Sequence, residues 1–179
     1  MCNPFTSEIL TAKQSFELLK LCDFNFKAKW KLLYRESKHG FASKNFHSKC
    51  DGYENTLTII QANPSSYIFG AFTSTIWDHS NRYKYDKDAF IYSLTNKENL
   101  PCKMSILTNK IQNAICCWSI LGPSFGNGDI RICEIIGNCS DLGNTFLHPK
   151  YKRGTNEAQS FLAGSHHFQV RDIEVYYKV

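Results

Sequence analysis

The sequence lacks any long hydrophobic run. Its longest mostly apolar stretch, residues 114–121, is interrupted by Ser119 and is far shorter than the ~20 residues that a membrane-spanning helix needs. The first residues, among them Asn3, Pro4 and Glu8, contain no apolar segment of the kind found in secretory signal peptides. We therefore expect an intracellular, cytoplasmic protein that does not insert into a membrane.

The eight cysteines also lack the spacings of common metal and redox sites. The sequence contains no Cys-x-x-Cys pair and no paired Cys/His ligand spacing. Adjacent Cys116 and Cys117 fall in an expected strand, where neighbouring side chains point to opposite faces, so we expect them to pack in the core. We expect His166 and His167 on opposite faces of a strand for the same reason, which prevents them from binding one ion. No metal site and no cofactor are predicted.

The chain has no excess of either charge beyond residue 50. The net charge is +5, with nine Lys or Arg against four Asp or Glu in residues 1–50 and twelve of each in residues 51–179. The basic residues of the first part are spread out along the sequence. This spacing is typical of a solvated face and does not predict a nucleic-acid site.

What the sequence does contain is enough apolar material for a core. It has 179 residues, of which 42% are hydrophobic, with 13 Phe, 9 Tyr and 3 Trp. This composition excludes a disordered chain and a coiled coil, and the length favours one domain. We expect a single domain over residues 11–179, preceded by an N-terminal leader of residues 1–10.

Two short helices are predicted. Thr11 and Gln14 have the spacing of a capping box, which predicts a helix over residues 12–21. An isolated helix of this length is marginal in water, so we expect it to dock on the main body with Phe16 and Leu19 buried. The alternative is a recognition arm that leaves both side chains exposed for a partner. A second helix is expected over residues 42–50, because Gly52 supplies a stop signal.

The remaining apolar segments have the alternation of strands, and no helix-length segments separate them for parallel crossovers. The expected strands cover residues 30–34, 56–62, 67–74, 89–94, 102–107, 114–119, 130–135, 168–170 and 173–177. The fold class expected is α+β, a mainly antiparallel β-sandwich of two sheets flanked by a few short helices. The phase of the alternation changes between Val170 and Ile173, which predicts a β-bulge at Arg171–Asp172.

Few groups in the sequence have the arrangement of a catalytic site. Cys50 and His47 are three positions apart on one helix face, so a Cys–His nucleophile or redox sensor is one interpretation. Burial of both in the core is the interpretation we favour. The glycine-rich segment Gly122–Asp129 is followed by neither Lys-Ser/Thr nor a helix, so we expect a structural turn with an exposed acidic residue instead of a phosphate site.

Taken in order, many short segments of the chain resemble the TLDc domain, the family of oxidation-resistance proteins. The resemblance covers nearly the whole chain and rests on these segments: Trp30–Tyr34, His39–Phe41, Phe46–His47, Lys49–Gly52, Thr56–Thr58, Tyr67–Gly70, Trp77, Ala89–Phe90, Ser93–Asn96, Gly122–Gly126, Ser160–Gly164 and Ile173–Tyr176. Three positions depart from the family pattern: Ala71 and Asn127, where glycines are usual, and Asp172, where Glu is common.

The resemblance implies a β-sandwich flanked by helices and a non-catalytic protein-interaction module. It links the chain to oxidative-stress resistance and to binding or regulation of the vacuolar proton pump (V-ATPase), and the family has no established enzymatic site. We therefore expect no enzyme. The contact surface expected for the protein partner is formed by Trp77, Gly122, Phe125, Gly126, Asp129 and Glu174. The alternative is a thiol-based redox enzyme or sensor that uses Cys50 and His47.

Overall fold

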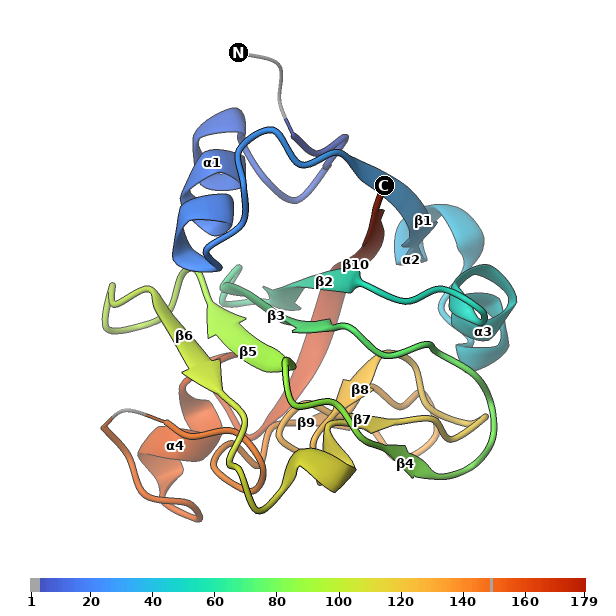
Figure 1. Cartoon of the computed structure of the whole chain (residues 1–179). Helices are drawn as coiled ribbons and strands as arrows, with labels where there is room; N and C mark the ends of the chain where they lie inside the picture. The colour runs from blue at the N-terminus through green and yellow to red at the C-terminus, as the bar shows by residue number, and fades with distance from the viewer. Residues whose placement is uncertain (1–3, 149) are drawn as a thin grey trace.

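Two antiparallel sheets form the centre of the computed structural model, which describes residues 4–148 and 150–179 (Figure 1). The larger sheet has the order β1-β10-β2-β3-β5-β6, and β9 also pairs with β10. Its strands are β1 (Trp30–Arg35), β2 (Thr56–Asn63), β3 (Ile68–Thr73), β5 (Phe90–Ser93), β6 (Cys102–Ser105), β9 (Asn138–Cys139) and β10 (His167–Lys178). The smaller sheet consists of β4 (Tyr83–Lys84), β7 (Ile115–Cys116) and β8 (Ser124–Phe125). This arrangement confirms the expected α+β class.

The helices are short and lie outside the sheets (Figure 1). They are α1 (Ala12–Leu21), α2 (Glu36–His39), α3 (Ser43–Cys50), α4 (Asn156–Ser160) and the 3-10 turn η1 (Ile111–Asn113). The capping box that predicted α1 is present: the backbone N–H of Gln14 donates to the Thr11 hydroxyl at 3.2 Å, and the backbone N–H of Thr11 donates to the Gln14 side chain at 3.0 Å. The sequence did not predict α2 or α4.

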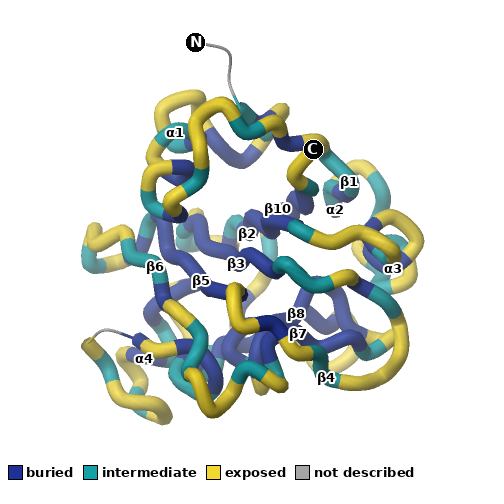
Figure 2. Tube along the Cα trace, viewed as in Figure 1, coloured by how far each residue is buried: buried dark blue, intermediate teal, exposed yellow. Residues whose placement is uncertain are grey.

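The larger sheet is covered on both faces (Figure 2). Side chains alternate along its central strands: Ile60 and Phe69 face the smaller sheet with Trp77 and Phe125. Ile59 and its neighbours on that side face α1 and the N-terminal segment. The molecule therefore has three layers, with helix α1 on one side of the sheet and the smaller sheet with its loops on the other.

Helix α1 docks on the sheet, but Phe16 is not on its buried face. Ser15, Leu18, Leu19 and Cys22 face inward, at the i, i+3, i+4 and i+7 positions of one helical stripe. Phe16 lies about 100° around the helix from Ser15, and its half-buried ring contacts the exposed Phe26 at a centroid distance of 6.4 Å. The docking prediction is thus confirmed for Leu19 and wrong for Phe16.

The segment before α1 also packs against this face. Phe5, Ile9 and Leu10 are buried in the same cluster as Leu18 and Leu19. Residues 1–3 of the segment expected as a leader lie outside the described residues. The boundary at residue 10 stays a prediction, while the contacts of residues 5–10 make that part of the segment a component of the core.

Strand predictions were confirmed for the sheet centre and wrong for residues 130–135. Those residues make only isolated bridges, such as Arg131 with Cys139. Side chains take the place of a neighbouring strand there, because the backbone N–H of Ile132 donates to the Ser124 hydroxyl and that of Cys133 to the Asn138 side chain. The predicted strand 114–119 is shortened to β7.

The last two predicted strands form one strand, β10, which carries the predicted bulge. Val170 pairs with Ala62 and Asp172 pairs with the adjacent Gln61, so Arg171 is the extra residue. The bulge lets Phe168 on one side and Ile173 on the other both face the core cluster. Asp172 beside the bulge accepts hydrogen bonds from the backbone and hydroxyl of Ser37 in α2 at 3.0 and 2.6 Å.

Candidate functional site

The glycine-rich turn Gly122–Asp129 is built around a buried carboxylate. Asp129 is 0% exposed, and its Oδ1 accepts hydrogen bonds from the backbone N–H groups of Gly143, Thr145 and Phe146 at 3.0 to 3.2 Å. The expected exposed acidic residue is therefore wrong. Burial of the carboxylate is explained by its three hydrogen bonds, because it accepts from backbone N–H groups of a neighbouring loop that have no strand partner.

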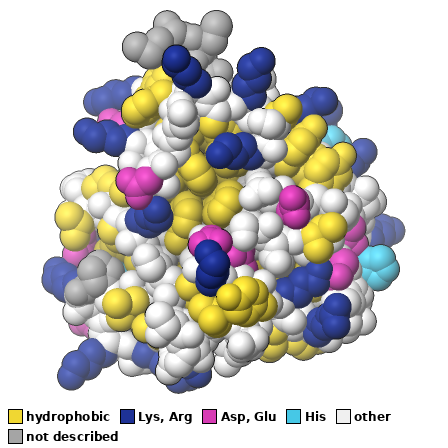
Figure 3. All heavy atoms as spheres, viewed as in Figure 1, with side chains coloured by type: hydrophobic (Ala, Val, Ile, Leu, Met, Phe, Trp, Pro, Cys, Tyr) yellow, Lys and Arg dark blue, Asp and Glu magenta, His cyan; other side chains and the backbone are white. Residues whose placement is uncertain are grey.

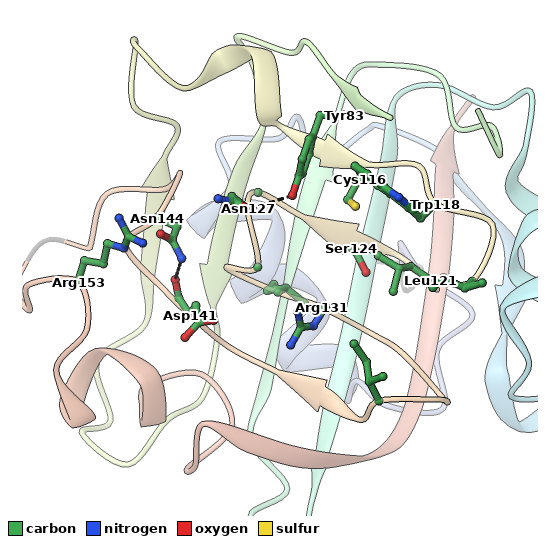
Figure 4. Close-up of a pocket in the computed structure, with 15 residues that line it drawn as sticks. Tyr83, Cys116, Trp118, Leu121, Ser124, Asn127, Arg131, Asp141, Asn144 and Arg153 are labelled. Carbon is green, nitrogen blue, oxygen red and sulfur yellow. Dashed lines mark hydrogen bonds between the residues drawn. The ribbon is translucent and has the colours of Figure 1, made fainter. Parts of the chain in front are cut away.

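Gly126 is required by the position of Asp129. It has φ +67°, and a Cβ at this position would lie 2.2 Å from Asp129 Oδ2. Left-handed conformations fall on Gly126 and Gly128, which flank Asn127. Asn127 serves a different purpose: its side chain accepts a hydrogen bond from the Tyr83 hydroxyl at 2.8 Å (Figure 4).

The aromatic residues of the expected contact surface lie inside the protein. Trp77 and Phe125 are 1% and 0% exposed, with ring centroids 5.5 Å apart. The Trp77 indole N–H donates to the Thr56 hydroxyl at 2.8 Å, and the N–H of buried Gly122 donates to the Ile132 carbonyl. These residues join the turn to the larger sheet.

Glu174 is also buried and lies on the opposite side of the sheet from the turn. Its carboxylate forms an ion pair with Arg35 at 2.9 Å and accepts hydrogen bonds from the Ser7 hydroxyl at 2.6 Å and the Glu8 backbone at 2.8 Å. The structure thus groups Trp77, Gly122, Phe125, Gly126 and Asp129, and places Glu174 apart from them. In this conformation none of these buried side chains offers a surface to a partner.

The Cys50–His47 pair is held in structural contacts. Cys50 is 0% exposed, and burial together with nearby Asp51 raises the pKa of its thiol well above the usual value. His47 Nδ1 lies 2.8 Å from Asp51 Oδ1, and Nε2 lies 3.1 Å from the Leu121 carbonyl. His47 therefore ties α3 to the glycine-rich turn, and the Cys50 thiol stays protonated and out of contact with solvent.

The sequence did not reveal a cavity on the outer side of the smaller sheet. The cavity has a volume of about 460 Å³, within the range of small-molecule and anchor-residue pockets. Figure 4 shows Trp118 and Cys116 on one side, Asp141, Asn144 and Arg153 on the other, and Arg131 between them. Its lining comes from segments between residues 83 and 153, so no local motif marks it.

Exposed aliphatic side chains surround this cavity. Ile120 and Ile136 line it and are 48% and 62% exposed, and neighbouring Ile135 is 68% exposed. Ile135 and Ile136 lie in a turn outside the two sheets. Arg131, Arg153 and Asp141 also line the cavity, so the region combines exposed aliphatic side chains with charged groups.

The basic residues do not form a single patch on the face shown in Figure 3, where Lys and Arg side chains lie among acidic and hydrophobic ones.

His166 and His167 were expected to point to opposite faces of one strand. In the structure β10 begins only at His167, and the two imidazole ring centroids are 4.3 Å apart. No helix in the described part of the chain has both the length and the apolar character needed to cross a membrane.

Comparison with known proteins identifies relatives across most of the chain. Nuclear receptor coactivator 7 from Mus musculus and from Homo sapiens are each 22% identical over 151 residues, which cover 82% of this chain. The chain spans 14% of the length of these relatives. The TLDc domain family matches residues 3–178. A match of this extent confirms the resemblance found in the sequence, and the chain belongs to the TLDc domain family.

Proposed function

We propose that the protein is a non-catalytic interaction module that binds a large protein assembly. The contact would be made through the rim of the cavity that Trp118, Arg131 and Ile136 line. The observation that carries the proposal is the pair of exposed Ile120 and Ile136 in the lining of a cavity with aromatic and arginine walls, with exposed Ile135 next to Ile136 in the chain. Energetically important residues at protein interfaces are enriched in Trp, Tyr and Arg, and contiguous exposed apolar side chains mark interaction sites.

The partner we propose is the vacuolar proton pump, in a role connected with oxidative-stress resistance. Membership of the TLDc domain family supports this choice. We propose the cytoplasm as the place of this interaction. The turn Gly122–Asp129 contributes to this surface, because Ser124, Gly126, Asn127 and Gly128 line the cavity, while the buried Asp129 holds the neighbouring loop.

The absence of catalysis is part of the same proposal. Cys50, the strongest thiol candidate, is buried with a raised pKa, and His47 and Asp129 are engaged by backbone groups. Such groups lack the access to substrate that a nucleophile or a general base requires. Peroxide consumption by the purified protein that is lost in Cys50→Ser would contradict this part and favour the redox alternative.

Affinity capture of the pump tests the proposal. The parent chain should retain pump subunits, and the double variant Ile135→Asp, Ile136→Asp should lose them because two charges would be placed on the apolar rim. Leu100→Asp is the matched control, since Leu100 is 48% exposed in the turn between β5 and β6. Equal capture by the double variant would exclude this face, and no capture by the parent, with an established pump-binding TLDc protein as positive control, would exclude the pump.

A further inference from the structure

The pairing of β9 with β10 brings three ligand-type side chains together. Cys139 pairs with His167, and the backbone N–H of Ser140 donates to the His166 carbonyl at 2.9 Å. Cys139 and Asp141 are two residues apart in extended chain, a spacing that places both side chains on one face. His166 reaches the same face from the neighbouring chain segment.

The ligand atoms of these residues converge. Cys139 Sγ, an Asp141 carboxylate oxygen and a His166 ring nitrogen all lie within 4.8 Å of one another. His166 Nε2 is 2.9 Å from Asp141 Oδ1, yet this buried nitrogen makes no aligned hydrogen bond to any group in the described part of the chain. This nitrogen therefore lies at ion-pair distance from Asp141 without an aligned hydrogen bond, and a buried polar atom in that position needs an explanation.

The surroundings hold the three residues in place. The Gln159 amide donates to Asp141 Oδ1 at 3.0 Å, and the backbone N–H of Asp141 donates to the Gly128 carbonyl at 2.8 Å. Cys139 exchanges two backbone hydrogen bonds with Arg131, each 3.0 Å long. Hydrogen bonds of this kind to ligating carboxylates and their backbone orient the ligands of metal sites.

We propose that Cys139, Asp141 and His166 bind a divalent cation of the zinc class. A thiolate, an imidazole and a carboxylate are the donor set of Zn²⁺, whereas Mg²⁺ and Ca²⁺ select oxygen ligands. Binding replaces the proton of the Cys139 thiol, which is released to solvent, and the thiolate and carboxylate balance the two charges of the ion. Three protein ligands leave a fourth position for water or another ligand.

The site lies at the edge of the cavity already described, since Asp141 lines that cavity. Burial raises the pKa of the Cys139 thiol, although the nearby Arg131 guanidinium opposes the rise, and the positive charge of Arg131 also opposes a bound cation. We therefore expect weaker binding than in structural zinc sites with four protein ligands. The proposal is independent of pump binding, because it concerns only residues of this chain.

Cobalt(II) is the probe for the test, because a thiolate bound to Co²⁺ produces a charge-transfer band in the near ultraviolet. The 179-residue chain should bind one equivalent of Co²⁺ with this band, and Zn²⁺ should remove the band by displacement. His166→Ala should weaken binding more than about 100-fold, beyond the loss caused by removing an outer-shell partner. Cys139→Ser should abolish the band and Asp141→Asn should weaken it.

Two control variants remove a residue of the same type outside the cluster. His167→Ala removes the exposed imidazole next to His166, and Cys102→Ser removes a half-buried thiol outside the cluster. Both should bind Co²⁺ as the parent does. Because Cys139 is buried, its variant could fail to fold, so the half-exposed His166 provides the deciding variant. No band in the parent with excess Co²⁺, a band that forms in His166→Ala at the same Co²⁺ concentrations as in the parent, or a band lost in either control would overturn the proposal.

Discussion

Asp129 is a single carboxylate whose environment makes stability depend on pH. Burial raises its pKa from 3.8 to about 6, although backbone hydrogen bonds oppose the rise. The folded state therefore binds more protons than the unfolded state between about pH 4 and pH 6. The contribution of Asp129 to stability is greatest below about pH 4 and decreases by about 3 kcal/mol as pH rises through its folded pKa.

Asp129→Asn should remove this pH dependence, because the amide oxygen still accepts the three backbone hydrogen bonds without carrying charge. We expect the free energy of unfolding of the variant, relative to the parent, to increase by about 3 kcal/mol between about pH 4 and pH 7. Urea unfolding at both pH values measures the difference. Asp88→Asn, at an exposed carboxylate, is the control. Parallel pH profiles for parent and Asp129→Asn would show that Asp129 does not carry the effect.

Gly126 allows a second prediction about a single residue. An added Cβ would lie 2.2 Å from Asp129 Oδ2 and 2.9 Å from the Thr145 Cβ. Gly137 also has a positive φ, at +83°, but an added Cβ there meets nothing within 4 Å. Gly126→Ala and Gly137→Ala share the backbone strain, and only the first has the clash, so Gly126→Ala should cost about 1–3 kcal/mol more. Equal losses of thermal stability would show that the turn around Asp129 adjusts freely.

At the scale of elements, helix α1 depends on docking more than on its own sequence. Leu19 is 0% exposed, so Leu19→Ala should cost about 2–5 kcal/mol. Phe16→Ala should cost less, because Phe16 is half-buried and contacts an exposed ring. Melting temperatures of the two variants beside the parent provide the measurement. A larger loss for Phe16→Ala than for Leu19→Ala would mean that the helix docks through a different face.

At the scale of the whole molecule, Glu174 joins the two ends of the chain to β1. Its buried carboxylate in β10 contacts Arg35 of β1 and Ser7 of the N-terminal segment. Arg35→Gln would leave this carboxylate buried without its counter-charge, which should cost about 3–5 kcal/mol. Lys13→Gln, which removes an exposed ion pair with Glu17, should change stability by less than about 1 kcal/mol. Chemical unfolding of the two variants measures both losses of stability. A loss for Arg35→Gln as small as that for Lys13→Gln would show that the Glu174 contacts are not coupled to folding.

The candidate site was only partly predictable. Its turn was predicted from three glycines and a proline, but the position of Asp129 was wrong, because the loop donors that surround it come from residues 143–146. The cavity brings together Tyr83, Trp118, Arg131 and Arg153. Their separation along the chain exceeds the range of any helical or strand periodicity, so no local pattern marks them as neighbours.

By itself, the sequence determined the local structure. The capping box of Thr11 and Gln14 marked the start of α1, alternation identified the strands β2 and β3, and a change of phase located the bulge at Arg171. Each of these features depends on residues a few positions apart. Tertiary structure alone decided that residues 130–135 leave the sheet and that Cys139 and Asp141 meet His166. Those outcomes depend on which distant segments supply hydrogen-bond partners, and that choice is made only when the sheets pack.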